Sequence, residues 1–247
     1  RVSEPAMQPE WLKHEVSVLG LARSGIAVAT LLARTGNLVY ASDAARTPEL
    51  ETAQQQLDRE GVDVGLGKHD LDRIARSSLV VVSPGVPPDS PPILAAQKAG
   101  VDVVSEVEIA LRFMPTARYI GITGTNGKTT TTALVAHLLR ALELRADAAG
   151  NIGTPLSALA LEPEPGPWVA LELSSYQLHF TPSVKPVVGA VTNLSPNHLD
   201  RYKDVASYYA DKRLMMRNAS PASQWVANED DADATAMIAD AAGLHAG

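Results

Sequence analysis

The sequence predicts an α/β protein built from two domains, each an open parallel sheet flanked by helices. Short apolar runs of strand length alternate with stretches of helical periodicity along nearly the whole chain. Two glycine-rich turns stand between such a strand and a helix, at residues 20–25 and 124–129. The length of 247 residues suits two ordinary domains. We place them at residues 1–116 and 117–247, because Pro115 and a polar stretch interrupt the pattern there.

The first domain begins with an apolar strand at residues 15–20, followed by a helix that ends at Gly36. A second strand at residues 38–43 and a later one at 78–85 continue the alternation. A strand, a helix and a second strand in this order form a βαβ unit, whose strands are parallel. We therefore expect a Rossmann-like sheet in this half.

The second domain repeats this organisation, with a strand at residues 119–124 and a helix that starts after Lys128. Its later elements are expected to be strands at 168–174, 186–195 and 223–228, and a helix at 206–219. This half is therefore predicted to be a second open parallel sheet.

Composition narrows the class of protein. Hydrophobic residues make up 45% of the chain, charged residues make up 20%, and the net charge of −7 argues against general nucleic-acid binding. The chain lacks an apolar run of the roughly 20 residues that a membrane helix needs, and its start lacks the apolar core of a signal peptide. A chain without cysteine forms no disulfide. We expect a cytoplasmic monomer that binds neither nucleic acid nor membrane.

The glycine-rich turn of the first half nearly matches the fingerprint of dinucleotide-binding domains. Gly20 suits the tight turn and Gly25 the close helix contact, but Ala22 replaces the glycine that lets the backbone approach a pyrophosphate. Asp43 ends the next strand, where such domains hold a ribose hydroxyl, and Gly85 lies in another turn after a strand. A nucleotide site and a plain turn with a capping aspartate both fit these residues. Ala22 disfavours a nicotinamide oxidoreductase.

The glycine-rich turn of the second half is the stronger signal. Its backbone N–H groups at residues 124–128 can form an anion nest, Lys128 can reach the β and γ phosphates, and the Thr129 hydroxyl can bind Mg²⁺. Ile122 stands where the common motif has its first glycine, so the loop is a variant. We assign a nucleoside triphosphate, ATP, to Gly124, Thr125, Asn126, Gly127, Lys128, Thr129 and Thr130.

Residues after neighbouring strands offer ligands for the metal that accompanies a triphosphate. Glu172 ends an otherwise apolar strand, and Mg²⁺ prefers oxygen ligands. His198 lies in the polar cluster NHLDRY beyond another strand. The other histidines, His69 among them, are interpreted as structural.

Five motifs in order resemble the Mur ligases, the ATP-dependent amide ligases of peptidoglycan precursor synthesis. They are GITGTNGKTT, AGNIGTP, LELSSYQL, NHLDRY and YYADKRL. Within the family, LELSSYQL and GNIGTP are most similar to the branch that adds D-glutamate to UDP-N-acetylmuramoyl-L-alanine. The resemblance implies a Rossmann-like UDP-binding domain followed by an ATP-binding domain of the P-loop ATPase type.

The resemblance also implies a mechanism. ATP phosphorylates the carboxylate of the UDP precursor, and the amine of D-glutamate attacks the acyl phosphate. Lys128 stabilises the transferred phosphoryl group, while Thr129 and Glu172 hold one Mg²⁺. His198 and a carbamylated Lys212 hold a second. Without the resemblance, Lys212 would be interpreted as an exposed helix lysine.

The substrate contacts are implied in the same way. Asn151, Ser174 and Gln177 touch the muramoyl-alanine end, and the UDP end is received by Arg23, Ser24, Asp43 and Gly85. The chain departs from the family at Ala44 and Ala45, where a hydroxyl and a basic side chain are common, and Arg46 is the nearest basic residue.

A third domain of the family brings the incoming amino acid, and these 247 residues are expected to end within the second domain. Three classes of function remain open on the sequence. The first is the D-glutamate ligase or a fragment of it, with another Mur ligase of different amino-acid substrate as its alternative. The second is a nucleotide-binding module without turnover, and the third is a nicotinamide oxidoreductase, which Ala22 and the phosphate loop disfavour.

Overall fold

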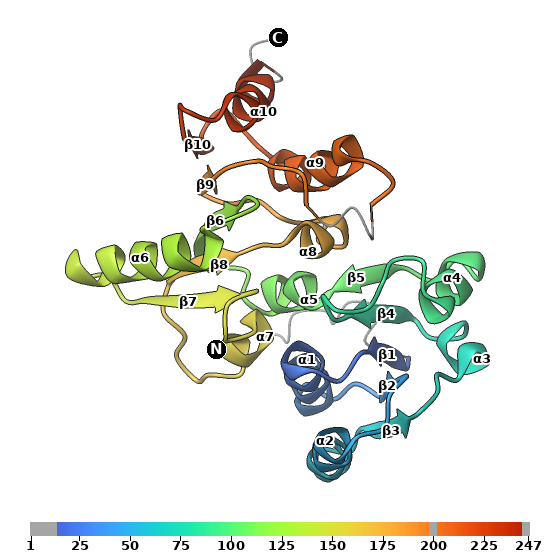
Figure 1. Cartoon of the computed structure of the whole chain (residues 1–247). Coiled ribbons are helices and arrows are strands. Elements are labelled where there is room, and N and C mark those ends of the chain that lie inside the picture. Colours follow the sequence, from blue (N-terminus) through green and yellow to red (C-terminus); the bar gives the residue numbers. More distant parts are fainter. Residues whose placement is uncertain (1–13, 198–201, 244–247) are drawn as a thin grey trace. The chain divides into compact units, whose positions relative to one another are not determined.

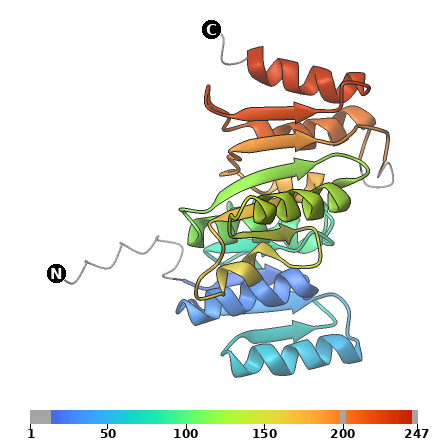
Figure 2. The ribbon, with the colours of Figure 1, turned by 90° about the vertical axis from the view of Figure 1, so that its left-hand side faces the viewer.

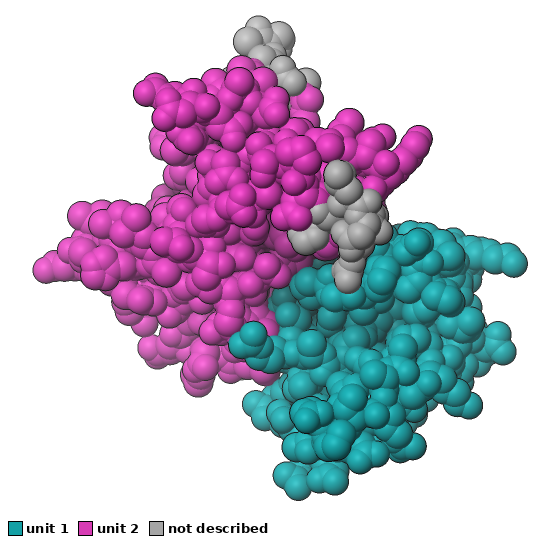
Figure 3. Space-filling model, viewed as in Figure 1, with its two compact units in different colours: residues 1–106 teal, residues 107–247 magenta. Residues whose placement is uncertain are grey.

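The computed structural model describes residues 14–197 and 202–243, and the chain divides into two compact units (Figures 1 and 3). Unit 1 comprises residues 1–106 and unit 2 residues 107–247. This boundary precedes the one expected near Pro115, because helix α5 (Glu106–Phe113) places Val107 and Ala110 in the hydrophobic core of unit 2.

The described part of unit 1 is a parallel sheet of five strands in the order β3-β2-β1-β4-β5, the order of a Rossmann fold. The expected strands at 15–20, 38–43 and 78–85 and the helix at 22–36 are confirmed. The strands are β1 (Val16–Leu19), β2 (Val39–Asp43), β3 (Asp63–Leu66), β4 (Leu79–Val82) and β5 (Val103–Ser105). The helices are α1 (Arg23–Arg34), α2 (Pro48–Arg59), α3 (Leu71–Ile74) and α4 (Pro91–Lys98).

The described part of unit 2 contains a second parallel sheet, in the order β10-β9-β6-β8-β7. Figure 2 shows α6 lying against this sheet, on the strands β6, β7 and β8. The strands are β6 (Arg118–Thr123), β7 (Ala146–Gly150), β8 (Trp168–Glu172), β9 (Val188–Val191) and β10 (Gln224–Ala227). After α5, the helices are α6 (Lys128–Ala141), α7 (Leu156–Ala160), α8 (Ser175–His179), α9 (Val205–Arg213) and α10 (Ala232–Gly243).

Two expected elements of unit 2 are shorter than predicted. The strand expected at 186–195 is β9 alone, because the chain leaves the sheet at Thr192 to support the neighbouring loop. The helix expected at 206–219 ends at Arg213 and continues as a short 3₁₀ turn, η2 (Leu214–Met216). Met215 and Met216 of that turn are buried in the core. The tighter turn therefore keeps both methionines buried.

The larger buried cluster of unit 2 brings its strands together with α5, α8 and η2, while Ile122, Ala136 and Ala170 form a smaller cluster at α6. Leu171 and Val191 on the strands, Leu178 on α8 and Met215 on η2 belong to one buried cluster.

None of the helices within residues 14–197 and 202–243 has the length and apolarity that crossing a bilayer requires.

Close backbone packing at Gly25 leads to a stability prediction for unit 1. A Cβ at this position would lie 1.8 Å from the carbonyl oxygen of Gly20, so Gly25→Ala must displace backbone. We expect the free energy of unfolding of unit 1 to fall by about 1–3 kcal/mol, as in overpacked cores. Urea unfolding followed by circular dichroism measures the change.

Gly85→Ala is the matched control, because an added Cβ there has no atom within 4 Å. We expect its free energy of unfolding to stay within about 0.5 kcal/mol of the unmodified protein. Equal unfolding midpoints for the two variants would contradict the packing argument.

Candidate active site

The loop between β6 and α6 has a backbone that requires glycine at two positions. Gly124 has a φ of 141° and Gly127 a φ of 79°, both in the region that disfavours other residues. A Cβ at Gly124 would also lie 2.0 Å from Thr192 Oγ1. The loop therefore follows β6 closely and turns directly into α6, as the motif predicted.

Asn193, two residues after the end of β9, holds this loop in place. Its side-chain oxygen accepts a hydrogen bond from Asn126 N at 2.9 Å, and its Nδ2 donates to Asn126 O at 2.9 Å. Its backbone oxygen accepts from Thr125 N at 2.8 Å. The N–H groups of Thr125 and Asn126, which were expected in the anion nest, therefore already donate to Asn193. The start of α6 has no side-chain cap, so its first N–H groups are the ones left to bind an anion.

The sequence did not predict the role of Asn193. Its one signal was its place at a strand end within TNLSPN, because polar residues there face the same edge as the loops of neighbouring parallel strands.

The loop is tied through Thr125 to the start of α10. Thr125 Oγ1 donates to Ser195 O and accepts from Ser195 N, both at 3.0 Å. The neighbouring Leu194 N donates to Asp231 Oδ2 at 2.7 Å, while Asp231 Oδ1 accepts from Ala234 N at 2.9 Å in the first turn of α10. One carboxylate thus serves a helix end and the segment beside the loop.

Lys128, the first residue of α6, is folded back onto the loop. Its Nζ donates to Gly124 O at 3.1 Å and to Thr125 O at 2.9 Å. Burial lowers the pKa of Lys128, and the nearby carboxylate of Glu172 opposes this shift. An ammonium group already beside the loop needs only a change of side-chain rotamer to meet a phosphate.

Glu172 and Thr129 meet as the sequence predicted. Glu172 ends β8 with 1% of its surface exposed, and its Oε2 accepts from Thr129 Oγ1 at 2.8 Å. Its Oε1 accepts from Asn151 Nδ2 at 3.1 Å. A buried carboxylate beside a hydroxyl is an oxygen donor set that fits Mg²⁺, which keeps waters and substrate oxygens as its other ligands. Among the described residues, no three His, Cys, Asp or Glu side chains gather as a metal cage.

Lys212 is buried, in contrast to the exposed lysine that the helix pattern alone suggests. Only 1% of its surface is exposed, and its Nζ donates to Gly124 O at 2.7 Å. The ammonium also lies 4.4 Å from the ring centroid of Tyr208. Burial and then the charge of Lys128 lower the pKa of Lys212 to about 7. A large fraction of this amine is therefore neutral at neutral pH.

Ser174 and Gln177 form a capping box at the start of α8. Gln177 N donates to Ser174 Oγ at 3.3 Å, and Ser174 N donates to Gln177 Oε1 at 3.0 Å. Gln177 is 2% exposed, and its Nε2 has no hydrogen-bond partner among the described residues. A buried amide donor in this state costs free energy unless an acceptor arrives, so Gln177 fits a ligand contact.

His198 lies outside the described residues, so its predicted role stays a prediction. The segment resumes at Tyr202, whose hydroxyl donates to Asp211 Oδ2 at 2.9 Å. Asp211 Oδ1 also pairs with His179 Nδ1 at 2.9 Å. The Tyr202 ring stacks on Tyr176, with centroids 5.3 Å apart. Asp211 therefore joins α8, α9 and the segment at Tyr202.

The predicted nucleotide residues of unit 1 surround the turn after β1. Asp43 accepts hydrogen bonds from Leu21 N at 2.8 Å and from Ala45 N at 2.9 Å, one on each carboxylate oxygen. It therefore shapes the glycine turn, the alternative that the sequence left open, while further lone pairs remain for a ligand. Arg23 and Ser24 begin α1. Gly85 is exposed in the turn after β4.

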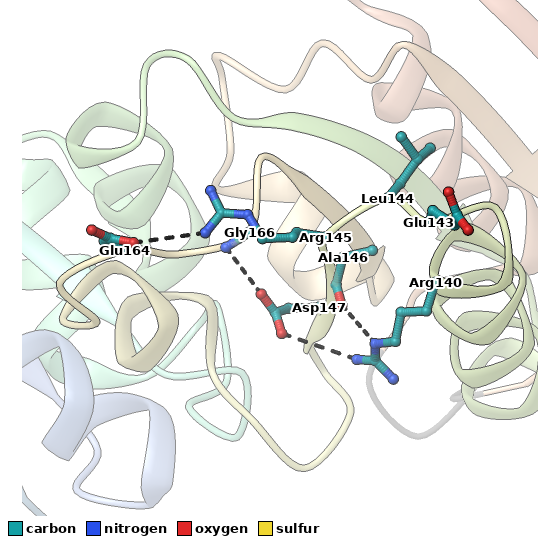
Figure 4. A pocket seen from close by; sticks show the side chains of 8 residues that line it. All are labelled: Arg140, Glu143, Leu144, Arg145, Ala146, Asp147, Glu164 and Gly166. Atoms are coloured by element: carbon teal, nitrogen blue, oxygen red, sulfur yellow. Dashed lines mark hydrogen bonds and ion pairs between the residues drawn. The ribbon is translucent and has the colours of Figure 1, made fainter.

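A surface hollow of about 440 Å³ is lined by residues of the end of α6 and the start of β7 (Figure 4). It is at the end of the sheet where β7 starts, and the loop is at the opposite end. Arg140 lies 4.0 Å from Asp147 and Arg145 lies 3.8 Å from Glu164, so its cations pair with its own carboxylates (Figure 4). We assign this hollow no part in the site.

Comparison with known families covers both units. The Mur ligase middle domain matches residues 122–246, and the N-terminal domain of MurD-like Mur ligases matches residues 14–105.

Curated relatives include proteins named UDP-N-acetylmuramoylalanine–D-glutamate ligase. The one from Anaeromyxobacter dehalogenans is 45% identical over 93% of this chain and 49% of its own length. The one from Microcystis aeruginosa is 38% identical over 88% of this chain and 48% of its own length. The chain thus spans about half the length of the curated relatives it matches.

Solved structures show the same fold. The UDP-N-acetylmuramate:L-alanyl-gamma-D-glutamyl-meso-diaminopimelate ligase from Neisseria meningitides matches with a TM-score of 0.60 at 17% identity, over 92% of this chain and 75% of that one. A murein peptide ligase from Psychrobacter arcticus matches with a TM-score of 0.57 at 19% identity, over 92% of this chain and 51% of that one.

The His179–Asp211 pair predicts a pH-dependent stability. The hydrogen bond to Asp211 raises the pKa of His179 above the usual 6.5, while burial and the charge of Arg217 oppose it. The pair therefore stabilises unit 2 fully below the unfolded-state pKa and loses this effect as pH rises through the folded-state pKa. Because the histidine is partly exposed, we expect less than about 1 kcal/mol.

The measurement compares His179→Gln with the unmodified protein by urea unfolding at pH 6 and pH 8.5. The loss of stability should be larger at pH 6. His137→Gln, on the exposed side of α6, serves as a control that should show no such difference. An equal loss at both pH values for His179→Gln would exclude an ionic role for the pair.

Proposed function

This chain belongs to the Mur ligase family, and we propose that it acts in the ATP-dependent ligation of D-glutamate to UDP-N-acetylmuramoyl-L-alanine. One observation supports the reaction class above the others. Lys128 and Lys212 both donate to Gly124 O in the phosphate loop, beside the Thr129–Glu172 pair. The choice of D-glutamate rests on the names of relatives that are 38% and 45% identical.

The proposed chemistry activates a carboxylate, which is otherwise a poor electrophile. A substrate carboxylate oxygen attacks the γ phosphorus of ATP, and ADP leaves. The amine of D-glutamate then attacks the acyl carbon, and phosphate leaves as the amide forms and a proton is released. The positive charge of Lys128 stabilises the phosphoryl group during its transfer. The N–H groups in the first turn of α6 bind the phosphate oxygens.

Thr129 and Glu172 are the residues that would hold Mg²⁺. The ion, when bound, offsets the charge of the ATP phosphates. Glu172 keeps its carboxylate oriented through Asn151, which binds its other oxygen. When the ion binds, the hydroxyl of Thr129 would give up its hydrogen bond to Glu172 and bind the ion instead.

Lys212 is proposed to act as a carbamate. Its neutral amine attacks CO₂, a proton leaves, and the product is an anion with two oxygens. An ammonium beside Lys128 is unfavourable, whereas an anion there is attracted to that lysine and fits a second Mg²⁺. His198 is proposed as the other protein ligand.

Each unit is proposed to contain substrate-binding residues of its own. Unit 1 binds the UDP end through the turns at Arg23, Ser24, Asp43 and Gly85. Unit 2 binds the muramoyl-alanine end through Asn151, Ser174 and Gln177, and the unpartnered Gln177 Nε2 supports this assignment. We propose that the protein acts as a monomer in the cytoplasm, where ATP is available.

Two independent nucleotide sites can be tested by titration calorimetry on this chain. We expect UDP-N-acetylmuramoyl-L-alanine and ATP with Mg²⁺ to bind separately. Lys128→Ala removes a charge-assisted hydrogen bond, commonly worth about 1.5–3 kcal/mol, so ATP should bind about 10- to 100-fold more weakly. The UDP precursor should bind that variant normally.

Lys185→Ala is the control, since Lys185 is an exposed lysine of the same unit. Unchanged ATP affinity in Lys128→Ala would refute the phosphate-loop assignment. For the chain together with the third domain of the family, phosphate release with D-glutamate but not with other amino acids tests the proposed specificity.

Carbamylation of Lys212 can be observed directly by ¹³C NMR under ¹³CO₂. We expect one slowly exchanging carbamate signal at pH 8, where the amine with a pKa of about 7 is mostly neutral. The signal should disappear in Lys212→Arg and persist in Lys203→Arg, which changes an exposed lysine. A signal that survives Lys212→Arg would place the carbamate elsewhere.

A further inference from the structure

The turn after β3 lies directly beside the turn after β2. Gly67 N donates to Asp43 O at 3.0 Å and to Ala45 O at 3.1 Å. A Cβ added at Gly67 would lie 3.8 Å from the Cβ of Arg46. Residues 67–69 therefore border the turn at residues 43–46, at the carboxyl ends of two neighbouring strands.

His69 is held in this border by Ser42. Ser42 Oγ and His69 Nδ1 are 2.9 Å apart, and Ser42 is fully buried in β2. Burial lowers the pKa of His69, and the smaller effect of Asp43 raises it, so the ring is mostly neutral at neutral pH. When the Ser42 hydroxyl donates to Nδ1, the proton of the neutral ring is on Nε2, which then remains as a donor.

Besides the lone pairs that Asp43 keeps free, the β2 turn offers few groups that could recognise a nucleotide. The side chains of Ala44 and Ala45 have no polar atom. Each oxygen of Asp43 already accepts a backbone N–H. Arg46 pairs with Glu51 at 3.1 Å, with both side chains more than half exposed. A polar ring at the adjoining turn can supply the contact that the two alanines lack.

We propose that His69 binds the uridine end of the UDP substrate. Its Nε2 donates a hydrogen bond to a carbonyl of the base or to a ribose hydroxyl. This inference rests on the proposed UDP site of unit 1. A neutral ring is a weak partner for a diphosphate, which is better matched by the positive end of α1. His69 is therefore a specificity-determining residue, which the sequence alone did not separate from structural histidines.

Substitution of His69 by asparagine or by glutamine distinguishes the roles of its two ring nitrogens. The side-chain amide of asparagine reaches the place of Nδ1, where its oxygen can accept from the Ser42 hydroxyl, so His69→Asn can keep the bond to Ser42 but loses the outer donor. The amide nitrogen of glutamine reaches the place of Nε2, so His69→Gln can keep the outer donor. The pair thus tests whether the outer nitrogen, rather than the bond to Ser42, contacts the nucleotide.

The experiment titrates UDP, ADP and pyrophosphate into the chain and its variants. We expect UDP to bind about five- to tenfold more weakly to His69→Ala and His69→Asn, as for one lost hydrogen bond, and within about threefold of normal to His69→Gln. Pyrophosphate affinity should not change, and preference for UDP over ADP should fall in the two weakened variants. Lys98→Ala, an exposed change on α4, is the control.

The outcomes separate this inference from the proposed function. No binding of UDP by the unmodified chain would refute the UDP site and the inference with it. Normal UDP binding in His69→Ala, or equal binding in the asparagine and glutamine variants, would overturn the inference alone. An equal loss of UDP and pyrophosphate would also overturn it, because His69 would then serve the phosphates. Thermal melting of each variant checks that unit 1 is folded.

Discussion

The amines of two lysines meet at one carbonyl oxygen, that of Gly124, and the cost of charging both amines at once is the constraint on which the candidate site depends. Lys128 and Lys212 come from different helices, and Lys212 is almost wholly buried. Like charges in a poorly solvated place repel each other unless an anion lies between them. The site is therefore prepared for negative charge before a ligand arrives, and the supports from Thr192 and Asn193 mean that the loop itself need not rearrange.

The sequence predicted the elements that carry local signals. The phosphate loop, its flanking strand and helix, and the meeting of Thr129 with Glu172 follow from glycine spacing and from the common edge of parallel strands. The support from Asn193 was not predicted, because its partner Asn126 is remote in the chain and a place at a strand end does not identify that partner. The burial of Lys212 was likewise hidden, since the polar residues around it are typical of an exposed helix.

Unit 1 shows a second limit of sequence analysis. The position of Asp43 was predicted correctly at the end of β2, but its hydrogen-bond partners could not be. The structure shows that both carboxylate oxygens hold backbone N–H groups of the turns around it. A residue type at a strand end therefore indicates where chemistry can occur, whereas the folded backbone decides which groups remain available for it.

Asp231 links the first turn of α10 to the phosphate loop through hydrogen bonds. Its carboxylate caps α10 and holds Leu194, and the next residue, Ser195, exchanges two hydrogen bonds with Thr125. Opening of the first turn of α10 would release the Leu194 amide, so the hydrogen-exchange protection of that amide is bounded by the local unfolding free energy of the helix. The ordering of a nucleotide loop is thereby set in part by the fraying of a helix more than 100 residues away in the chain.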